Sequence, residues 1–318
     1  MAYEKFLHVK HGGNVPLSWI DFSISVNPFF PKFFDNYEIE LNTLSSRYIY
    51  FEDIEESISK KISHDINLCA GTTESLYLLN MAFNNDVVIE KGSYGEYERV
   101  AKLFNKNVHI VDSVMNHEYN NCIVILNNPK NPNGDFLNYN TIKNFVESNL
   151  SKNNIPVLDD AFLDFILFDS NDWEKKWTFE GAIHLRTYTK SYSLPGIRVG
   201  YFIDPYDKMK KFKMPWSIGS IGKLFLIKML KDDGEFLKYS MNLLDIERRR
   251  INAILDTDNK SPFFFCRVNN KKELIEVLNN NKMMVRDCSS FGYDSFIRFG
   301  IRKHFENNKL IDILKNYI

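Results

Sequence analysis

The stretch Thr187-Tyr-Thr-Lys190-Ser-Tyr-Ser-Leu-Pro-Gly-Ile-Arg198-Val-Gly200 places a lysine, a Pro-Gly turn and an arginine just after an apolar run. A lysine amine condenses with aldehydes, and its pKa falls readily on burial. Arg198 and Thr187 can reach a phosphate, the arginine through its permanent charge and forked donors. The stretch therefore predicts a site for a phosphorylated aldehyde, although surface charges beside a turn would explain the same residues if nothing else agreed.

Two further apolar runs also end in polar residues. The run from Cys122 to Leu126 leads into a turn-rich loop that contains Asn131, and the run from Ile155 to Leu158 is followed at once by Asp159. Ligands bind at the carboxyl ends of parallel strands, where the loops converge. An aspartate there can pair with a protonated pyridine nitrogen, and an asparagine can donate to a phenolic oxygen. Together with Lys190, these residues predict that the aldehyde is pyridoxal phosphate (PLP).

The same segments resemble the fold-type I PLP enzymes of the class I/II aminotransferase family, over nearly the whole chain. Asn131-Pro-Asn-Gly134 is similar to the NPxG loop of the family, Asp159-Asp-Ala-Phe162 to its D-x-A-[YF] element, and Thr187 to Arg198 to its Schiff-base segment. The resemblance implies that Lys190 and Asp159 are catalytic, and that Asn131, Thr187 and Arg198 also bind the cofactor. It implies an α/β fold, with a large domain built on a mostly parallel mixed sheet flanked by helices, plus a smaller α+β domain.

Two more segments complete the cofactor site that the resemblance implies. Gly71-Thr72-Thr73 precedes an apolar helix, and N–H groups at a helix N-terminus can bind a phosphate. Tyr94 stands at the aromatic position that stacks on the cofactor ring in relatives. Phe162 replaces the tyrosine of other family members, so a hydroxyl contact to the ring oxygen is expected to be missing.

The ends of the chain narrow the resemblance. His11-Gly-Gly-Asn14 and the segment from Asp21 to Pro28 resemble threonine-phosphate decarboxylases, with histidinol-phosphate aminotransferases as the neighbouring group. In that subgroup the resemblance implies that His11 and Arg286 contact the substrate phosphate, with Asn27 beside its approach, and that Arg298 takes the carboxylate. A guanidinium suits both tasks because it binds anions in a bidentate way. Taken separately, each arginine is equally well explained as a surface charge at a strand end.

These residues predict PLP-dependent decarboxylation of O-phospho-L-serine or O-phospho-L-threonine to an amino alcohol phosphate. The bond held perpendicular to the cofactor ring is the one that breaks, so holding the substrate at both ends selects the reaction. Because the sequence does not show that angle, transamination of a phosphorylated substrate is the alternative. A third reading, a protein kept for binding or regulation, is disfavoured by the complete set of Lys190, Asp159, Asn131 and Arg198.

Composition sets outer bounds on the function. The 318-residue chain has a formal net charge of −1, which argues against nucleic acid as a principal partner. There is no apolar run of membrane-spanning length, no signal-peptide pattern and no CxxC pair among the four cysteines. A cytoplasmic protein without membrane contact is therefore expected. His8 and His11 have the spacing of half a metal site, but no ligand cluster accompanies them, and no metal is predicted.

The order of elements predicts how the chain is divided. Apolar strands alternate with amphipathic helices, which predicts a largely parallel sheet with helices on both faces. We expect an N-terminal segment, 1–34, that joins the small domain, a large PLP-binding domain, 35–225, and a small C-terminal domain, 226–318. A long helical segment is expected from Ile221 to Ile254.

A homodimer with shared sites is also expected from the resemblance. Tyr48 aligns with a tyrosine that in relatives reaches the PLP phosphate of the neighbouring subunit. Ile49 stands where relatives usually carry proline, so Tyr50 is a competing candidate. An aromatic side chain packed within its own subunit is the simpler alternative.

Overall fold

Seven strands form the central sheet of the protein, in a computed structural model that describes residues 9–35, 38–170 and 172–318. Their order across the sheet is β2-β8-β7-β6-β5-β3-β4. They span Asn67–Cys69 (β2), Val87–Glu90 (β3), Val108–Val111 (β4), Ile123–Asn127 (β5), Ile155–Asp159 (β6), Ile183–Thr187 (β7) and Gly200–Ile203 (β8). Strands β3 to β7 run parallel, and β8 is antiparallel to both of its neighbours. The mostly parallel mixed sheet predicted from the sequence is therefore confirmed.

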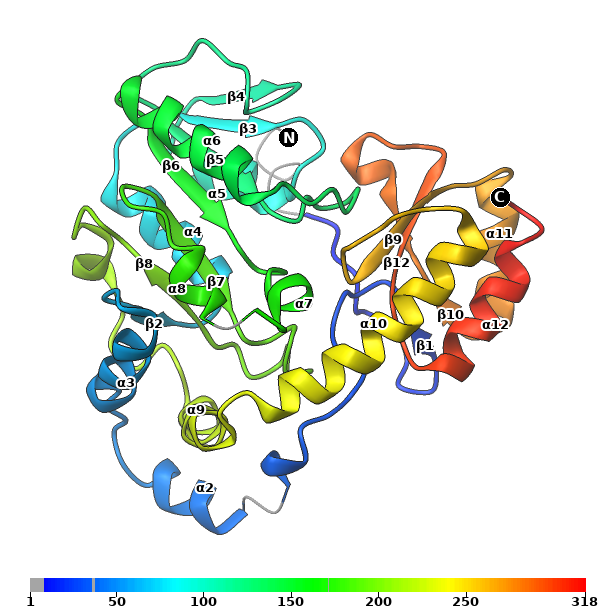
Figure 1. Ribbon diagram of the computed structural model, residues 1–318, viewed down its shortest axis with the longest axis horizontal. Coiled ribbons are helices and arrows are strands. Elements are labelled where there is room, and N and C mark those ends of the chain that lie inside the picture. Colours follow the sequence, from blue (N-terminus) through cyan, green and yellow to red (C-terminus); the bar gives the residue numbers. More distant parts are fainter. Residues whose placement is uncertain (1–8, 36–37, 171) are drawn as a thin grey trace.

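Helices cover both faces of this sheet (Figure 1). Ile125 of β5 packs in one apolar cluster with Leu76 of α4, whereas Val124 packs in another with Phe145 of α6. Successive strand residues point to opposite faces, so a strand covered on both sides has to be apolar throughout. The helices of this lobe span Glu38–Ser45 (α2), Glu52–Ile62 (α3), Thr72–Ala82 (α4), Gly95–Leu103 (α5), Tyr139–Ser151 (α6), Asp164–Leu167 (α7), Trp173–Lys176 (α8) and Ser220–Asp232 (α9), with 3-10 turns at Lys32–Phe34 and Met209–Phe212.

A smaller lobe holds three antiparallel strands in the order β11-β12-β9, packed against three helices. Its elements span Glu235–Leu255 (α10), Phe263–Arg267 (β9), Lys271–Asn280 (α11), Met283–Met284 (β10), Arg286–Asp287 (β11), Cys288–Phe291 (a 3-10 turn), Phe296–Gly300 (β12) and His304–Leu314 (α12). The N-terminal segment packs here as well. Its strand β1, Ile20–Asp21, pairs in parallel with β10, and Phe22 is fully buried in the apolar cluster of the lobe.

The structure corrects the continuous helical segment expected from Ile221 to Ile254. Helix α9 ends at Asp232 and α10 begins at Glu235, because Asp233 and Gly234 take positive φ angles of 47° and 84°. A right-handed helix cannot continue through two left-handed residues, and glycine adopts this conformation without a steric penalty. The break redirects the chain, so that α10 runs from the large lobe to the small lobe (Figure 1).

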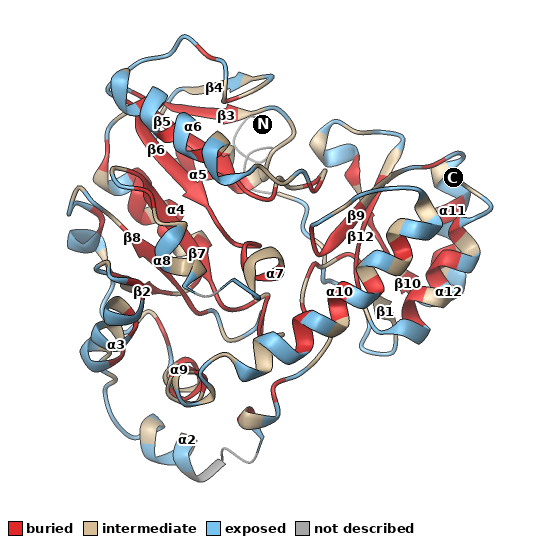
Figure 2. Cartoon of the chain, in the orientation of Figure 1, coloured by how far each residue is buried: buried red, intermediate tan, exposed pale blue. Residues whose placement is uncertain are grey.

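Burial follows this two-lobe arrangement. The strands of the central sheet are largely buried, whereas the outward faces of the helices are exposed (Figure 2). Toward the carboxyl ends of the parallel strands, Asn127 of β5, Asp159 of β6 and Leu185 of β7 lie side by side in register. The polar residues that follow these three strands therefore meet at one edge of the sheet.

Candidate active site

Lys190 lies in the turn that follows strand β7. Its backbone carbonyl accepts a hydrogen bond from the backbone N–H of Asn27 (2.9 Å), which ties this turn to the N-terminal segment. Its Nζ atom lies 5.3 Å from the centre of the Phe162 ring. Burial lowers the pKa of the Lys190 amine, an effect that the Asp159 carboxylate opposes and nearby guanidinium groups reinforce. Removal from water therefore favours the neutral amine, which is the form that condenses with an aldehyde.

Asp159 is the last residue of β6 and is only 7% exposed. Its Oδ2 accepts a hydrogen bond from the Tyr97 hydroxyl (2.7 Å), and its Oδ1 accepts one from the backbone N–H of Ala161 (3.1 Å). Burial raises the pKa of Asp159, while the Tyr97 bond and the charge of Lys190 oppose that rise. Among the described residues no cation forms an ion pair with this carboxylate. It is therefore a site that a cationic nitrogen would complete.

The N-terminus of helix α4 faces the guanidinium of Arg198. Gly71 precedes the helix with a φ of 80°, and a Cβ atom built on it would lie 2.7 Å from Nη2 of Arg198. The positive φ favours glycine at this position, and the missing Cβ leaves room for the guanidinium. The guanidinium donates to the neutral carbonyl oxygens of Ala70 (3.3 Å) and Pro195 (3.2 Å). A positive charge beside the unpaired N–H groups of a helix N-terminus forms a cup suited to a phosphate.

Other residues predicted to bind the cofactor lie around this phosphate cup. Burial raises the pKa of Tyr94 to about 12, and the neighbouring Thr73 side chain opposes that rise. Thr72 is the first residue of α4 and is buried. Thr187 donates its hydroxyl to the backbone carbonyl of Val199 (2.9 Å). The structure thus brings Thr72, Thr73 and Tyr94 together at the cup, while the hydroxyl proton of Thr187 is engaged with the backbone.

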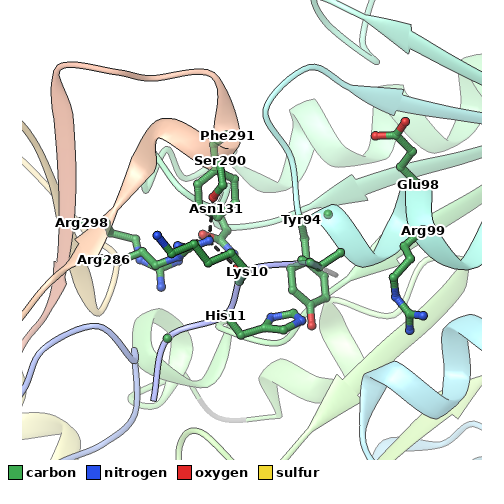
Figure 3. A pocket seen from close by; sticks show the side chains of 13 residues that line it. Lys10, His11, Tyr94, Glu98, Arg99, Asn131, Arg286, Ser290, Phe291 and Arg298 are labelled. Carbon is green, nitrogen blue, oxygen red and sulfur yellow. Dashed lines mark hydrogen bonds between the residues drawn. The ribbon is translucent and has the colours of Figure 1, made fainter. Parts of the chain in front are cut away.

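Arg286 and Arg298 are direct partners across two strands of the small sheet. Arg286 lies on β11 and Arg298 on β12, paired in register, and they are 5% and 7% exposed. Residues directly opposite each other in an antiparallel pair have their Cβ atoms about 5 Å apart. Both arginines line a cavity of about 430 Å³, together with His11, Tyr94 and Asn131 (Figure 3). The strand register therefore brings two guanidinium groups to one cavity.

Neutral oxygen atoms, not carboxylates, accept the hydrogen bonds of these arginines. Arg286 donates to the backbone carbonyl of Lys10 (2.6 Å) and to the Ser290 hydroxyl (2.8 Å). Arg298 donates to the carbonyl of Ser23 (3.2 Å), and its buried Nε has no partner. Burial lowers the pKa of Arg298 to about 10 and also lowers that of Arg286. Within the described ranges neither guanidinium forms an ion pair, so this wall of the cavity favours an anionic ligand.

Asn131 joins this anion-binding wall to the edge of the central sheet. It lies in the loop after β5, and its Oδ1 accepts a hydrogen bond from Nη1 of Arg298. Because Oδ1 is occupied, the side-chain amide presents its N–H donors to the remaining space. That orientation agrees with the predicted hydrogen bond from Asn131 to a phenolic oxygen of the cofactor.

His11 comes from the N-terminal segment and lines the same cavity (Figure 3). Its Nε2 lies 3.1 Å from Oε1 of Glu96, a buried residue of α5. The neighbouring residue, Lys10, accepts the hydrogen bond of Arg286 described above. The N-terminal segment therefore contacts both lobes at the cavity. His8 lies outside the described residues, and within them no cluster of three or more metal-ligating side chains occurs.

The side chain of Asn27 is hydrogen-bonded within the protein. Its side-chain amide donates to the backbone carbonyl of Ser191 (2.7 Å) and to the hydroxyl of Ser240 (2.8 Å). It is 1% exposed and braces the segment after Lys190 against α10. Its contact with the approach to the phosphate stays a prediction.

Tyr48 and its competitor Tyr50 both lie on the surface of the subunit. Tyr48 is 75% exposed, and its ring packs against that of Trp216 with the centroids 4.6 Å apart. Tyr50 is 60% exposed. A single chain does not bring either residue to a second active site, so the shared site also stays a prediction.

The fold and the site together define a fold-type I PLP enzyme. The family model described as aminotransferase class I and II matches residues 35–314. The chain therefore belongs to the class I and II aminotransferase family.

The chain is similar to several known proteins over most of its length, at low sequence identity. The histidinol-phosphate aminotransferase of Staphylococcus epidermidis is 26% identical in an alignment of 304 positions, and the match covers 86% of this chain and 84% of the relative. The structure of histidinol-phosphate aminotransferase from Clostridium acetobutylicum matches with a TM-score of 0.81 at 26% identity, over 93% of this chain and 98% of that one. The structure of L-threonine-O-3-phosphate decarboxylase from Porphyromonas gingivalis also has a TM-score of 0.81, at 21% identity and with the same coverage.

These comparisons overturn the predicted decarboxylation of phosphoserine or phosphothreonine. The sequence relatives and the structure at 26% identity are named histidinol-phosphate aminotransferases, whereas the decarboxylase structure, at 21% identity, shows a shared fold alone. The prediction rested on the resemblance of His11-Gly-Gly-Asn14 and of the segment from Asp21 to Pro28 to threonine-phosphate decarboxylases, which implied contacts to the substrate phosphate. Such a contact carries no information about which bond at the substrate Cα breaks, and the lyase prediction was wrong for that reason.

The residues at the strand ends fit PLP on three independent grounds. The unpaired Asp159 carboxylate matches a protonated pyridine nitrogen, the cup of Gly71 and Arg198 matches a phosphate, and the Lys190 amine of lowered pKa matches an aldehyde. The family assignment and the site agree, and the enzyme is PLP-dependent.

Sequence reasoning missed two functional residues of α5. Tyr97 donates to Asp159, and Glu96 pairs with His11. A signal for Tyr97 was present, since it lies three residues after Tyr94, which directly precedes α5, and the two rings lie 5.5 Å apart. Glu96 carried no such signal, because its partner lies 85 residues away in the sequence.

The covalent role of Lys190 can be tested by borohydride trapping. We expect reduced wild-type enzyme to carry PLP on the peptide that contains Lys190, and Lys190→Ala to carry none, as measured by mass spectrometry. Because the cup at Gly71 and Arg198 remains, the variant can still hold PLP non-covalently, so affinity is not the readout. Lys91→Ala removes an exposed lysine and serves as the control. Trapping of PLP on another lysine of the wild-type enzyme would refute the assignment.

Proposed function

We propose that the enzyme is an aminotransferase that moves the amino group of a phosphate-bearing amine to a 2-oxo acid. The proteins it resembles are named histidinol-phosphate aminotransferases, which agrees with this reaction. The observation that carries this proposal is a pair of buried arginines, Arg286 and Arg298, that share a cavity with His11 and have no ion-pair partner in the part of the chain that the structure describes. A transaminase alternates between two anionic substrates in one site, and a cavity with two unneutralised cations suits both.

The division of work among the residues follows from their positions. We assign Arg286 and His11 to the substrate phosphate, because both lie where the N-terminal segment crosses the cavity. We assign Arg298 to the carboxylate next to the reacting carbon of the 2-oxo acid and of the amino acid formed from it, because it contacts Asn131 and contributes to the lowered pKa of Lys190.

The cofactor contacts are proposed on the same basis. Lys190 is the covalent attachment point, Asp159 holds the pyridine nitrogen and the Asn131 amide donates to the phenolic oxygen. Tyr94 would contact the ring. Gly71, Thr72, Thr73, Thr187 and Arg198 surround the phosphate. When bound, PLP supplies an electron-withdrawing ring over which charge at the substrate Cα is spread.

The chain supplies orientation and proton transfer. With its phosphate held by Arg286 and His11, the amine substrate presents its Cα–H toward Nζ of Lys190, so that binding energy is used for alignment. Burial lowers the pKa of Lys190, which favours the neutral amine that can accept this proton at Nζ. The hydrogen bond from Tyr97 opposes the effect of burial on Asp159 and helps to keep that carboxylate charged.

The reaction itself is tested by product analysis. Holoenzyme incubated with histidinol phosphate and 2-oxoglutarate should form one glutamate for each histidinol phosphate consumed, measured by liquid chromatography with mass spectrometry. Carboxyl-labelled O-phosphothreonine supplies the comparison. Release of labelled CO₂ as the dominant reaction, or no glutamate from any phosphorylated amine, would contradict the proposal.

Substitutions of the two arginines should affect different substrates to different extents. Arg298→Ala should impair turnover of every substrate, whereas Arg286→Ala should mainly lower kcat/KM for histidinol phosphate relative to histidinol. Truncating a charge-assisted contact to a desolvated anion costs about 2–5 kcal/mol. Arg267→Ala, which removes an exposed arginine of the same sheet, is the matched control. An unchanged ratio in Arg286→Ala would place the phosphate elsewhere, with His11 the next residue to test.

We further propose that the enzyme is a homodimer whose interface includes the exposed aromatic group of Tyr48, Tyr50 and Trp216. These side chains are 75%, 60% and 50% exposed in the single chain, and contiguous exposed aromatics mark interaction surfaces. Sedimentation should show a dimer that is weakened by Tyr48→Ala. A monomeric wild-type enzyme with full activity would refute the shared site.

We place the enzyme in the cytoplasm. Its four cysteines are all free, as is usual in a reducing compartment. No helix within the described residues is both long and apolar enough to cross a membrane.

A further inference from the structure

A chain of polar contacts runs from the cavity into the large lobe. Nε2 of His11 lies 3.1 Å from Oε1 of Glu96, and Arg99 donates to the other oxygen of that carboxylate (2.7 Å). Arg99 also donates to the hydroxyl of Tyr77 (2.7 Å). His11 is half-exposed, whereas Glu96 is 4% exposed. The histidine at the cavity is thus anchored to a buried carboxylate, which is itself held by an arginine.

The charge state of Glu96 determines how His11 is held. Burial alone would raise the pKa of Glu96, but the hydrogen bonds from His11 and Arg99 keep it below the usual value. An ionised carboxylate can only accept, so Nε2 of His11 must carry a hydrogen. The ring is then fixed in orientation, and Nδ1 is the nitrogen left for another partner. It can donate to a phosphate oxygen when the imidazole is protonated on both nitrogens.

The backbone on either side of His11 is held as well. The Lys10 carbonyl accepts the hydrogen bond from Arg286, and the side chain of Val9 lies against the start of α5, where a Cβ on Gly95 would be 3.0 Å from it. The segment around His11 therefore crosses the cavity between α5 of the large lobe and β11 of the small lobe (Figure 3). Arg286 and Glu96 are its two polar anchors.

We propose that Glu96 is a positioning residue that holds the His11 imidazole for the substrate phosphate and so sets the preference for phosphorylated amines. The inference rests on the proposed function, because it takes His11 as a phosphate ligand. Glu96 does not itself oppose the phosphate strongly, since its charge is offset by Arg99 and it lies behind the histidine ring.

If Glu96 only stabilised the fold, its removal would have a different effect. The residue lies in the first turn of α5, where an acidic side chain stabilises a helix through its dipole. Its loss would then lower stability whether or not His11 is present. Acting through His11, Glu96 should instead affect phosphate binding only while the imidazole is there.

The test is a double-mutant cycle on the PLP-loaded enzyme. Inorganic phosphate is titrated calorimetrically into wild type, Glu96→Gln, His11→Ala and the double variant; the cofactor already fills the other phosphate cup. Glu96→Gln should weaken phosphate binding about tenfold in the wild-type background and by less than about twofold in His11→Ala. KM for the phosphorylated amine should rise in parallel, while KM for the dephosphorylated alcohol stays unchanged. Glu147→Gln, which removes an exposed carboxylate of α6, is the control.

Equal losses in both backgrounds, or tighter phosphate binding in Glu96→Gln, would overturn the inference. If Glu96→Gln does not fold, Glu96→Asp, which retracts the carboxylate by one methylene, is put through the same cycle with the same criterion. The calorimetric readout needs no turnover. A wild-type enzyme that binds phosphate through the coupled pair but does not transaminate would therefore refute the proposed function and leave this inference standing.

Discussion

The site depends on two guanidinium groups that the small sheet holds opposite each other. Like charges at directly paired positions of a sheet destabilise it, and here both are buried. Neutral oxygens satisfy part of their hydrogen-bonding capacity, and each guanidinium lies 5.0 Å from the centre of an aromatic ring, Arg286 over Phe291 and Arg298 over Phe263. The charge itself is left without a counter-ion among the described residues. An anionic ligand would relieve that imbalance, and this constraint therefore favours an anionic substrate.

A second buried network stabilises the edge of the sheet where the cofactor residues lie. It is centred on Asp160, the residue after Asp159. Oδ2 of Asp160 accepts hydrogen bonds from Nδ1 of His184 (2.7 Å) and Nε of Arg186 (2.9 Å). Nε2 of His184 accepts from the backbone N–H of Phe179, so the ring hydrogen lies on Nδ1, and burial lowers the pKa of His184. The network joins the ends of β6 and β7. It thereby fixes the relative positions of Asp159 and the turn that carries Lys190.

Much of the cofactor site could be predicted from the sequence, because the residues that form it lie in short contiguous segments. Apolar runs followed by turn residues marked the ends of β5, β6 and β7, and parallel pairing then brings their last residues together whatever the rest of the chain does. Two features were not predicted correctly from the sequence, for different reasons. The helix break at Asp233 and Gly234 had a local glycine signal that the surrounding apolar periodicity obscured. The reaction was mispredicted because the motifs report which groups are bound and not how the substrate Cα is turned.

The sequence by itself determined the fold class, the cofactor and the residues that gather at the strand ends, since backbone periodicity and turn chemistry act over a few residues. Tertiary structure alone decided which distant side chains became partners. The register of β11 against β12 pairs Arg286 with Arg298, and the path of the N-terminal segment sets His11 against Glu96. Those contacts join segments far apart in the chain, and their geometry is fixed by packing of the two lobes, which no local pattern encodes.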